Sequence, residues 1–106
     1  MKTRMVEQRE GELLGPVDWN YDFDQHGINP KYVEQGKNNL KIIEDGLSKG
    51  KKFRVGYCGI NHKVISVGMY DGWPFWRPTP SVLLNTWMGG EWHPFYDIQN
   101  VEEVNG

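Results

Sequence analysis

The chain has 106 residues, enough for one domain, and its net charge of −2 excludes a strong overall attraction to nucleic acid or to an anionic membrane. Hydrophobic residues make up 38% and charged residues 25%, as in ordinary globular proteins, and a single cysteine excludes a disulfide within the chain. The sequence has neither the run of roughly 20 apolar residues that spans a membrane nor the apolar centre of a signal peptide, so we expect a soluble, cytoplasmic protein.

Aromatic side chains are the unusual part of the composition, with five tryptophans, five tyrosines and four phenylalanines. Large rings supply much of the buried area in a core, so a short chain needs only some of them for stability. We therefore expect one set of rings to fill the core and the surplus to form a contact patch on the surface.

The N-terminal part of the chain divides into an arm and the start of a folded domain. Residues 1–16 are mostly polar and end in a Gly15-Pro16 break, so we expect a flexible arm there and a single α+β domain over 17–106. The stretch VDWNYDFDQ, residues 17–25, alternates aromatic and polar side chains. This alternation predicts an amphipathic strand or an extended arm docked by its rings.

Two short patterns are typical of the beginnings of metal sites, but neither is completed. The acidic residues of 17–25 have the spacing that opens a calcium loop, yet Phe23 stands where that loop needs glycine and Asn29 where it needs a bidentate carboxylate. Cys58 and His62 would be one half of a zinc site whose second ligand pair is missing. We therefore expect no metal and no cofactor.

A helix is predicted over about 30–49. Asn29 offers a capping side chain, Pro30 suits the first helical position, and Gly50 is a plausible stop. Apolar and small residues then recur at spacings of three and four and form one stripe: Val33, Gly36, Leu40, Ile43 and Leu47. Glycine on this stripe allows the helix to lie close to the surface that it covers.

After Gly50 the sequence takes on the alternation that is typical of β-strands. We predict strands over 53–58, 64–70, 82–88 and 92–98, turns at 59–62, 71–72 and 89–90, a returning segment at 73–76 and a terminal turn within 99–106. Proline cannot donate to a ladder, so edge or bulged positions are expected at Pro74, Pro78, Pro80 and Pro94.

These elements predict an α+β fold: one amphipathic helix packed on a curved antiparallel sheet of four to five strands. The helix stripe is the only long apolar cover for the sheet. An SH3-like small barrel is the alternative, because short strands joined by tight turns can also close on themselves.

The stretch MYDGWPFWRP, residues 69–78, concentrates rings and prolines around an Asp-Gly pair. Tryptophan, tyrosine and arginine are the residues that most often anchor protein contacts. The candidate binding residues are Trp73, Phe75, Trp76, Arg77, Trp87 and Trp92. We therefore expect a non-catalytic interaction module that binds another protein or a peptide through this patch or through an exposed sheet edge, with no membrane partner.

Single-stranded nucleic acid is an alternative partner. The stretch 49–54 holds a basic cluster, of which Lys51, Lys52 and Arg54 are the candidate contacts. Phe53 and Tyr57 supply rings of the kind that stack on bases. The cluster is short and the chain is acidic overall, so a solvated helix end is the favoured interpretation.

A small enzyme is the second alternative. It would use Cys58 as nucleophile with His62 or His93 as base, and Asp71 or Asp97 to orient that base. The chain has no nucleophile elbow, phosphate loop or kinase signature. The sequence therefore favours binding over catalysis.

Overall fold

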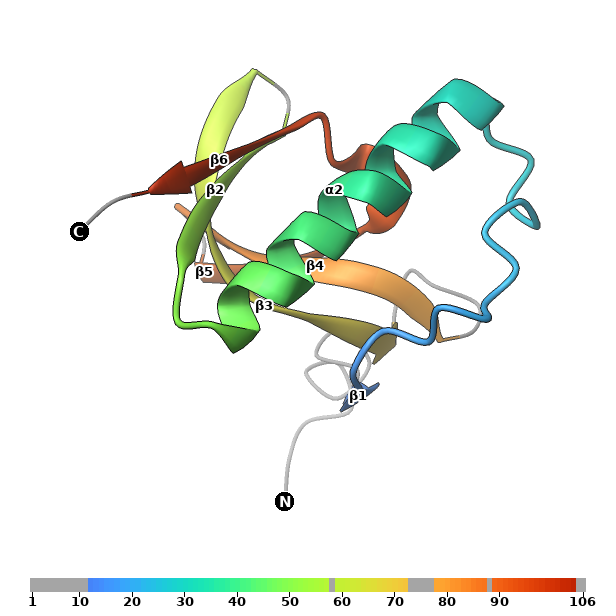
Figure 1. Cartoon of the computed structure of the whole chain (residues 1–106), viewed down its shortest axis with the longest axis horizontal. Helices are drawn as coiled ribbons and strands as arrows, with labels where there is room; N and C mark the ends of the chain where they lie inside the picture. Colours follow the sequence, from blue (N-terminus) through green and yellow to red (C-terminus); the bar gives the residue numbers. More distant parts are fainter. Residues whose placement is uncertain (1–11, 58, 73–77, 88, 105–106) are drawn as a thin grey trace.

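The computed structural model of the chain describes residues 12–57, 59–72, 78–87 and 89–104. One helix lies across one face of an open, six-stranded antiparallel sheet in this part of the chain (Figure 1). The predicted α+β class is confirmed, and the barrel alternative is wrong because the sheet does not close. No helix in these ranges is long and apolar enough to cross a membrane.

Helix α2 spans Pro30–Ser48, one residue shorter than predicted, and both of its ends follow from local chemistry. The Asn29 side chain accepts a hydrogen bond from the backbone N–H of Lys31 at 2.9 Å. At the other end Gly50 takes a positive φ of 81°. The backbone N–H of Lys51 then donates to the Gly46 carbonyl at 2.9 Å, and that of Gly50 to the Leu47 carbonyl at 3.1 Å. This pair of bonds is the Schellman ending that glycine favours.

The sheet has the strand order β5-β4-β3-β2-β6, and β1 pairs separately with β3. The strands are β1 Glu12–Gly15, β2 Lys52–Tyr57, β3 Ile60–Asp71, β4 Thr79–Thr86, β5 Gly89–Pro94 and β6 Asn100–Val104. A short 3-10 turn, η1 Phe95–Asp97, connects β5 to β6. In the described chain β5 and β6 end this path and the short β1 also pairs on one side, so Pro94 of β5 lies on an edge as predicted.

The long strand β3 has β4 on one side and shares its other side between two shorter strands. Arg54 of β2 pairs with Lys63 near the start of β3, and Leu13 of β1 pairs with Tyr70 near its end. Residues 12–15, which we assigned to the arm, thus add a short strand to the sheet. The arm prediction otherwise concerns residues 1–11, which lie outside the described residues.

Several predicted turn positions are wrong because the ladders extend further than expected. Tyr57 pairs with Ile60, so His62 belongs to β3 rather than to a turn. Thr86 pairs with Gly89, so β4 ends before Trp87 and the Gly89-Gly90 pair belongs to β5 rather than to a turn. The predicted strand 92–98 stops at Pro94, where η1 begins, and the predicted terminal turn contains strand β6.

The predicted hairpin turn at Asp71-Gly72 is also wrong. Asp71 ends β3, and the register pairs Tyr70 with Thr79, the first residue of β4. The connection between the strands is therefore longer than a tight turn. Pro80 pairs with Met69 of β3. The pairing of β4 with β5 starts one residue later, at Ser81, so the N–H that Pro80 lacks is not needed in the β4–β5 ladder.

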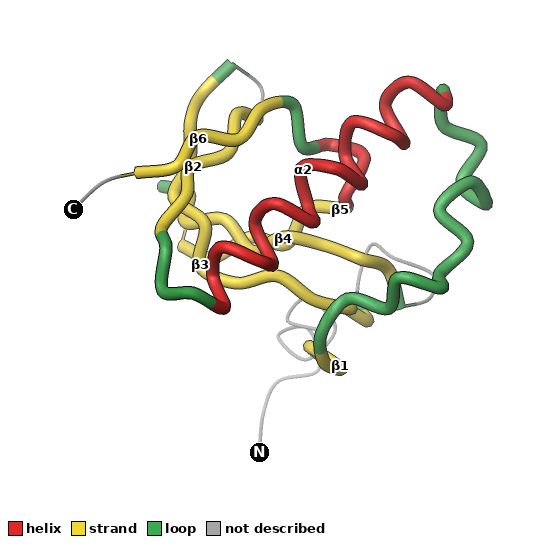
Figure 2. Tube along the Cα trace, in the orientation of Figure 1, coloured by secondary structure: helices red, strands yellow, loops and turns green. Residues whose placement is uncertain are grey.

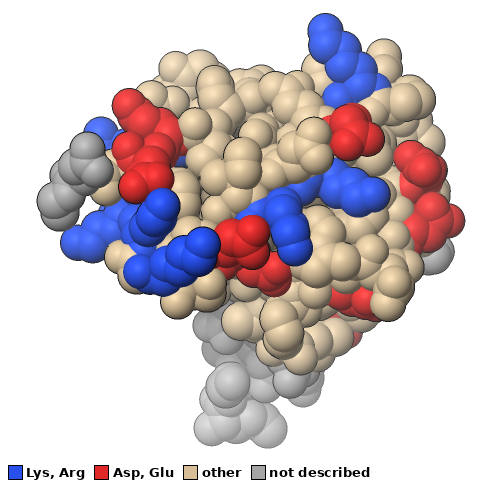
Figure 3. Space-filling view, viewed as in Figure 1, with Lys and Arg blue, Asp and Glu red and all other residues tan. Residues whose placement is uncertain are grey.

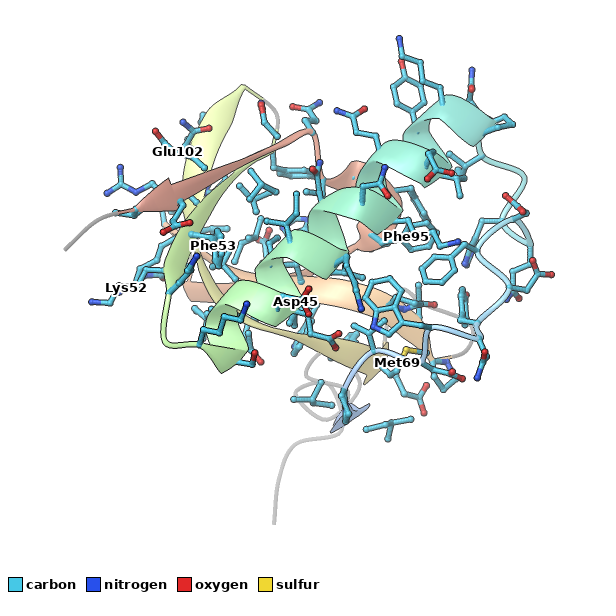
Figure 4. The ribbon with its side chains drawn as sticks, in the orientation of Figure 1. Asp45, Lys52, Phe53, Met69, Phe95 and Glu102 are labelled. Carbon is cyan, nitrogen blue, oxygen red and sulfur yellow. The ribbon has the colours of Figure 1, made fainter. Side chains whose placement is uncertain are left out.

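The core lies between α2 and the sheet, and two glycines bring the layers close together. A Cβ added at Gly36 would overlap the backbone of Phe95, and one added at Gly46 would overlap the ring of Phe53. In Figure 4 Phe53 is labelled at β2, on one side of the helix, and Phe95 on its other side. The buried hydrophobic residues of this core are Val17, Phe23, Val33, Leu40, Ile43, Phe53, Val55, Val64, Val82, Leu84, Phe95 and Ile98. The close approach inferred from Gly36 in the stripe is confirmed.

The segment 17–29 runs as a loop from β1 to the start of α2 (Figure 2), so the predicted strand at 17–25 does not form. Asp18 Oδ1 accepts from the Asn20 N–H at 3.0 Å, and Asp22 Oδ1 accepts from the Asp24 N–H at 3.2 Å. These aspartates fold the backbone into local turns, which compete with an extended chain.

The rings of this loop still dock, as the second reading of the segment predicted. Phe23 is buried with an exposed fraction of 4%, and Trp19 packs beside it. Glu44 of α2 holds the loop by accepting from the Val17 N–H at 3.1 Å and from Trp19 Nε1 at 2.8 Å.

Candidate functional site

The structure separates the predicted binding residues into two groups. Trp87 and Trp92 belong to the β4–β5 hairpin. The others, namely Trp73, Phe75, Trp76 and Arg77, lie outside the described residues.

Trp87 projects from the turn of the β4–β5 hairpin. Its exposed fraction is 91%, the highest among the exposed large hydrophobic residues in the described chain. Thr86 and Gly89 pair on either side of the turn, and the Thr86 hydroxyl donates to the Gly89 carbonyl at 2.9 Å. Gly89 has a φ of 103°, a conformation that side chains rarely permit. The contacts between Thr86 and Gly89 therefore hold the backbone on either side of Trp87, and the indole is exposed to solvent.

The hairpin also carries apolar residues on the sheet face that points away from α2. Val82 and Leu84 face the core, so Leu83 between them points outward. A Cβ added at Gly90 would lie 3.2 Å from Leu83 Cδ1 and 3.9 Å from Ile65 Cδ1, which shows that these positions adjoin. Ile65 is 48% exposed.

Trp92 lies opposite Leu83 in the β4–β5 register and is partly buried. Its ring stacks on Tyr70, with centroids 4.7 Å apart and an interplanar angle of 17°. We call Ile65, Leu83, Trp87 and Trp92 the outer patch. Within it Trp87 is exposed to solvent, whereas Trp92 stacks on Tyr70.

Sequence reasoning missed Ile65 and Leu83 as surface residues. One signal was present, because adjacent residues of a strand point to opposite faces and Leu83-Leu84 cannot both enter one core. A bulge in β3 between Val64 and Ser66 shifts the register at Ile65. No sequence pattern predicted this bulge.

A second cluster forms around Tyr57 and contains two of the residues considered for catalysis. The centroids of the His93 and Tyr57 rings are 4.1 Å apart, and those of the His62 and Tyr57 rings are 6.5 Å apart. His93 is only 7% exposed, and Glu91 Oε1 lies 3.1 Å from its Nε2. The third candidate, Cys58, lies outside the described residues.

Burial controls the protonation of this cluster. It lowers the pKa of His93 from the ordinary 6.5, although the carboxylates of Glu91 and Asp97 act in the opposite direction. Burial also raises the pKa of Asp97 above 3.8, with His93 opposing that shift. Although Glu91 lies close, the geometry gives Nε2 no hydrogen bond among the described residues. The Glu91 carboxylate lies within ion-pair distance and favours the charged ring, but burial outweighs it.

The buried position of His93 disfavours its use as a catalytic base. A base must come within about 3.2 Å of the proton that it removes, and the Nε2 of His93 is closed to solvent. Groups of three or more His, Cys, Asp or Glu side chains that would hold a metal do not occur in the described ranges.

The basic cluster predicted for nucleic-acid binding is exposed but lies beside acidic residues of β6. Lys51 Nζ is 3.6 Å from Glu103 Oε1, and Arg54 pairs across the strands with Glu102. Figure 3 shows basic and acidic side chains gathered together over this end of the molecule, and Figure 4 places Lys52 and Glu102 on the two paired strands. Their opposite charges shorten the reach of the positive potential.

Comparisons of the chain with protein-family models, with curated proteins and with solved structures found no match.

Proposed function

We propose that this chain is a non-catalytic recognition module that binds an extended segment of another protein along the β4–β5 hairpin. The observation that carries the proposal is the 91% exposure of Trp87 in a tight turn. Tryptophan is enriched among residues that dominate binding energies, and large exposed apolar groups commonly mark contact sites.

The position of the hairpin favours an extended segment over a globular surface as the partner. Strand β5 lies at the edge of the described sheet, where an added strand can pair with the backbone. Alternate side chains of such a strand would lie on the outer face beside Trp92, which adjoins Leu83 across the ladder. Gly89 and Gly90 add no bulk at one end of β5, and Pro94 limits pairing at the other.

Panning a displayed library of random peptides against the immobilised chain tests this proposal. Enriched peptides should alternate apolar residues, and Trp87→Ala should weaken their binding about 30-fold, because truncating an anchoring tryptophan costs about 2 kcal/mol. Tyr32→Ala is the matched control, since Tyr32 is also an exposed ring, at 52%, but lies on α2. Failure to enrich any peptide, or equal binding by the Trp87→Ala chain, would refute the proposal.

The two alternatives receive less support from the geometry. For nucleic acid, Glu102 and Glu103 lie beside the basic cluster and offset its charge. For catalysis, His93, which lies near Glu91 and Asp97, is buried. Both alternatives remain predictions from the sequence.

A further inference from the structure

His93 joins the proposed binding hairpin to a buried cluster of titratable groups. It belongs to edge strand β5, next to Trp92 of the outer patch, but points to the opposite face. Groups from each neighbouring element surround it: Glu91 from β5, Asp97 from η1, His62 from β3 and Tyr57 from β2. Its partner across the β4–β5 ladder is the apolar Val82.

This environment accommodates a neutral imidazole better than a charged one. The ring is 7% exposed and lies against Tyr57, and its Nε2 has no hydrogen bond within the described residues. A proton on His93 would require water or a well-directed carboxylate. Glu91 Oε1 lies 3.1 Å from Nε2 and favours the charged ring, but burial of the ring outweighs it, so protonation is favoured when the chain opens and admits water.

Movement of β5 is a rearrangement that would admit water to His93. In the described sheet this strand pairs only with β4, so separating it exposes His93 without unfolding the helix or the central strands. The same movement would displace Trp92 from its stack on Tyr70 and disturb the turn that holds Trp87.

We propose that protonation of His93 in mildly acidic solution loosens strand β5 and thereby weakens the peptide-binding hairpin. The loosening of β5 is a property of the isolated chain and does not depend on the proposed function. The effect on peptide binding rests on the proposed function. His93 is thus an acid-sensitive latch, meaning a buried side chain whose protonation releases the strand that carries the recognition surface.

The sign of the effect follows from proton linkage. Because burial lowers the pKa of His93 below 6.5, an opened or unfolded chain takes up the proton first, and folding stability falls as the pH decreases through 6.5. Asp97 acts oppositely: its pKa is raised above 3.8, so acidification through that raised pKa relieves a cost of burying its charge. The latch should therefore open between about pH 7 and the lowered pKa of His93.

Hydrogen exchange of the full chain at pH 7.5 and pH 5.5, corrected for intrinsic exchange rates, tests the proposal without a partner. Protection of the amides in 89–94 should fall up to about tenfold at the lower pH, because the open form gains one proton near its ordinary pKa. The amides of α2 should change much less. In His93→Phe, which keeps a ring but cannot titrate, the difference between β5 and α2 should disappear, whereas His62→Gln should behave like the unmodified chain.

An equal loss of protection in the unmodified chain and in His93→Phe would overturn the latch. Should His93→Phe not fold, NMR titration of the His93 ring decides the matter in the unmodified chain. The latch requires the ring to titrate below 6.5 together with the loss of β5 protection, and titration at or above 6.5 would overturn it. Because no peptide is present, failure here leaves the Trp87 prediction intact, and failure of that prediction leaves the latch intact.

Discussion

Replacing Gly36 by alanine tests the close contact between α2 and the turn η1. In an isolated helix this change would stabilise by about 1 kcal/mol, because alanine is the better helix former. In this protein the added Cβ would overlap the carbonyl oxygen and carbon of Phe95. Those are backbone atoms, so the overlap cannot be relieved by a side-chain rotation, and the helix or η1 must move.

Overpacking of this kind typically costs 1–3 kcal/mol, and we expect Gly36→Ala to destabilise the protein by about 2 kcal/mol. In a chain of this size that cost lowers the melting temperature by roughly 8–16 °C. Urea unfolding followed by tryptophan fluorescence measures the free energy. Asn38→Ala is the control, since it gains helix propensity at an exposed position of α2. A Gly36→Ala chain as stable as the unmodified protein would show that the packing between α2 and η1 is loose.

Two further predictions concern the docked loop and the basic cluster. Glu44→Ala should lower the free energy of unfolding by about 1–3 kcal/mol, because it removes the acceptor for Val17 N–H and Trp19 Nε1. The exposed neighbour Asp45→Ala should change it by less than about 0.5 kcal/mol in the same urea titration, and equal effects would contradict this account of the loop. Fluorescence titration with a thymidine oligonucleotide should show no saturable binding at physiological salt. Tight binding that is lost with added salt and in a triple alanine variant of Lys51, Lys52 and Arg54 would instead support the nucleic-acid alternative.

The helix and the general arrangement of the sheet could be predicted because their signals are local. Asn29 and Pro30 start α2 through groups adjacent in sequence, and Gly50 ends it in the same way. The stripe from Val33 onward also identifies the buried face correctly, since its spacing depends only on helix geometry. Signals of this kind need no knowledge of distant neighbours.

The errors arose where local signals compete or where the partner is distant. Asp71-Gly72 is a strong turn signal, yet pairing of Tyr70 with Thr79 and Leu13 prevails over it. The alternation over 17–25 resembles a strand, but its aspartates cap local turns.

Strand β6 has too weak a pattern to be recognised without its partner β2. The outer patch was predicted only in part, because its residues come from separate strands and meet through register.

The pairing of β2 with β6 has a consequence for biosynthesis. On the ribosome, β2 and β3 emerge together and can form a hairpin early, but β6 is the last described strand to appear. Until it does, one side of β2 is an unpaired edge open to contact with other nascent chains. The outward cations Lys52 and Arg54 would repel a like-charged copy during this interval, which makes them gatekeepers against aggregation.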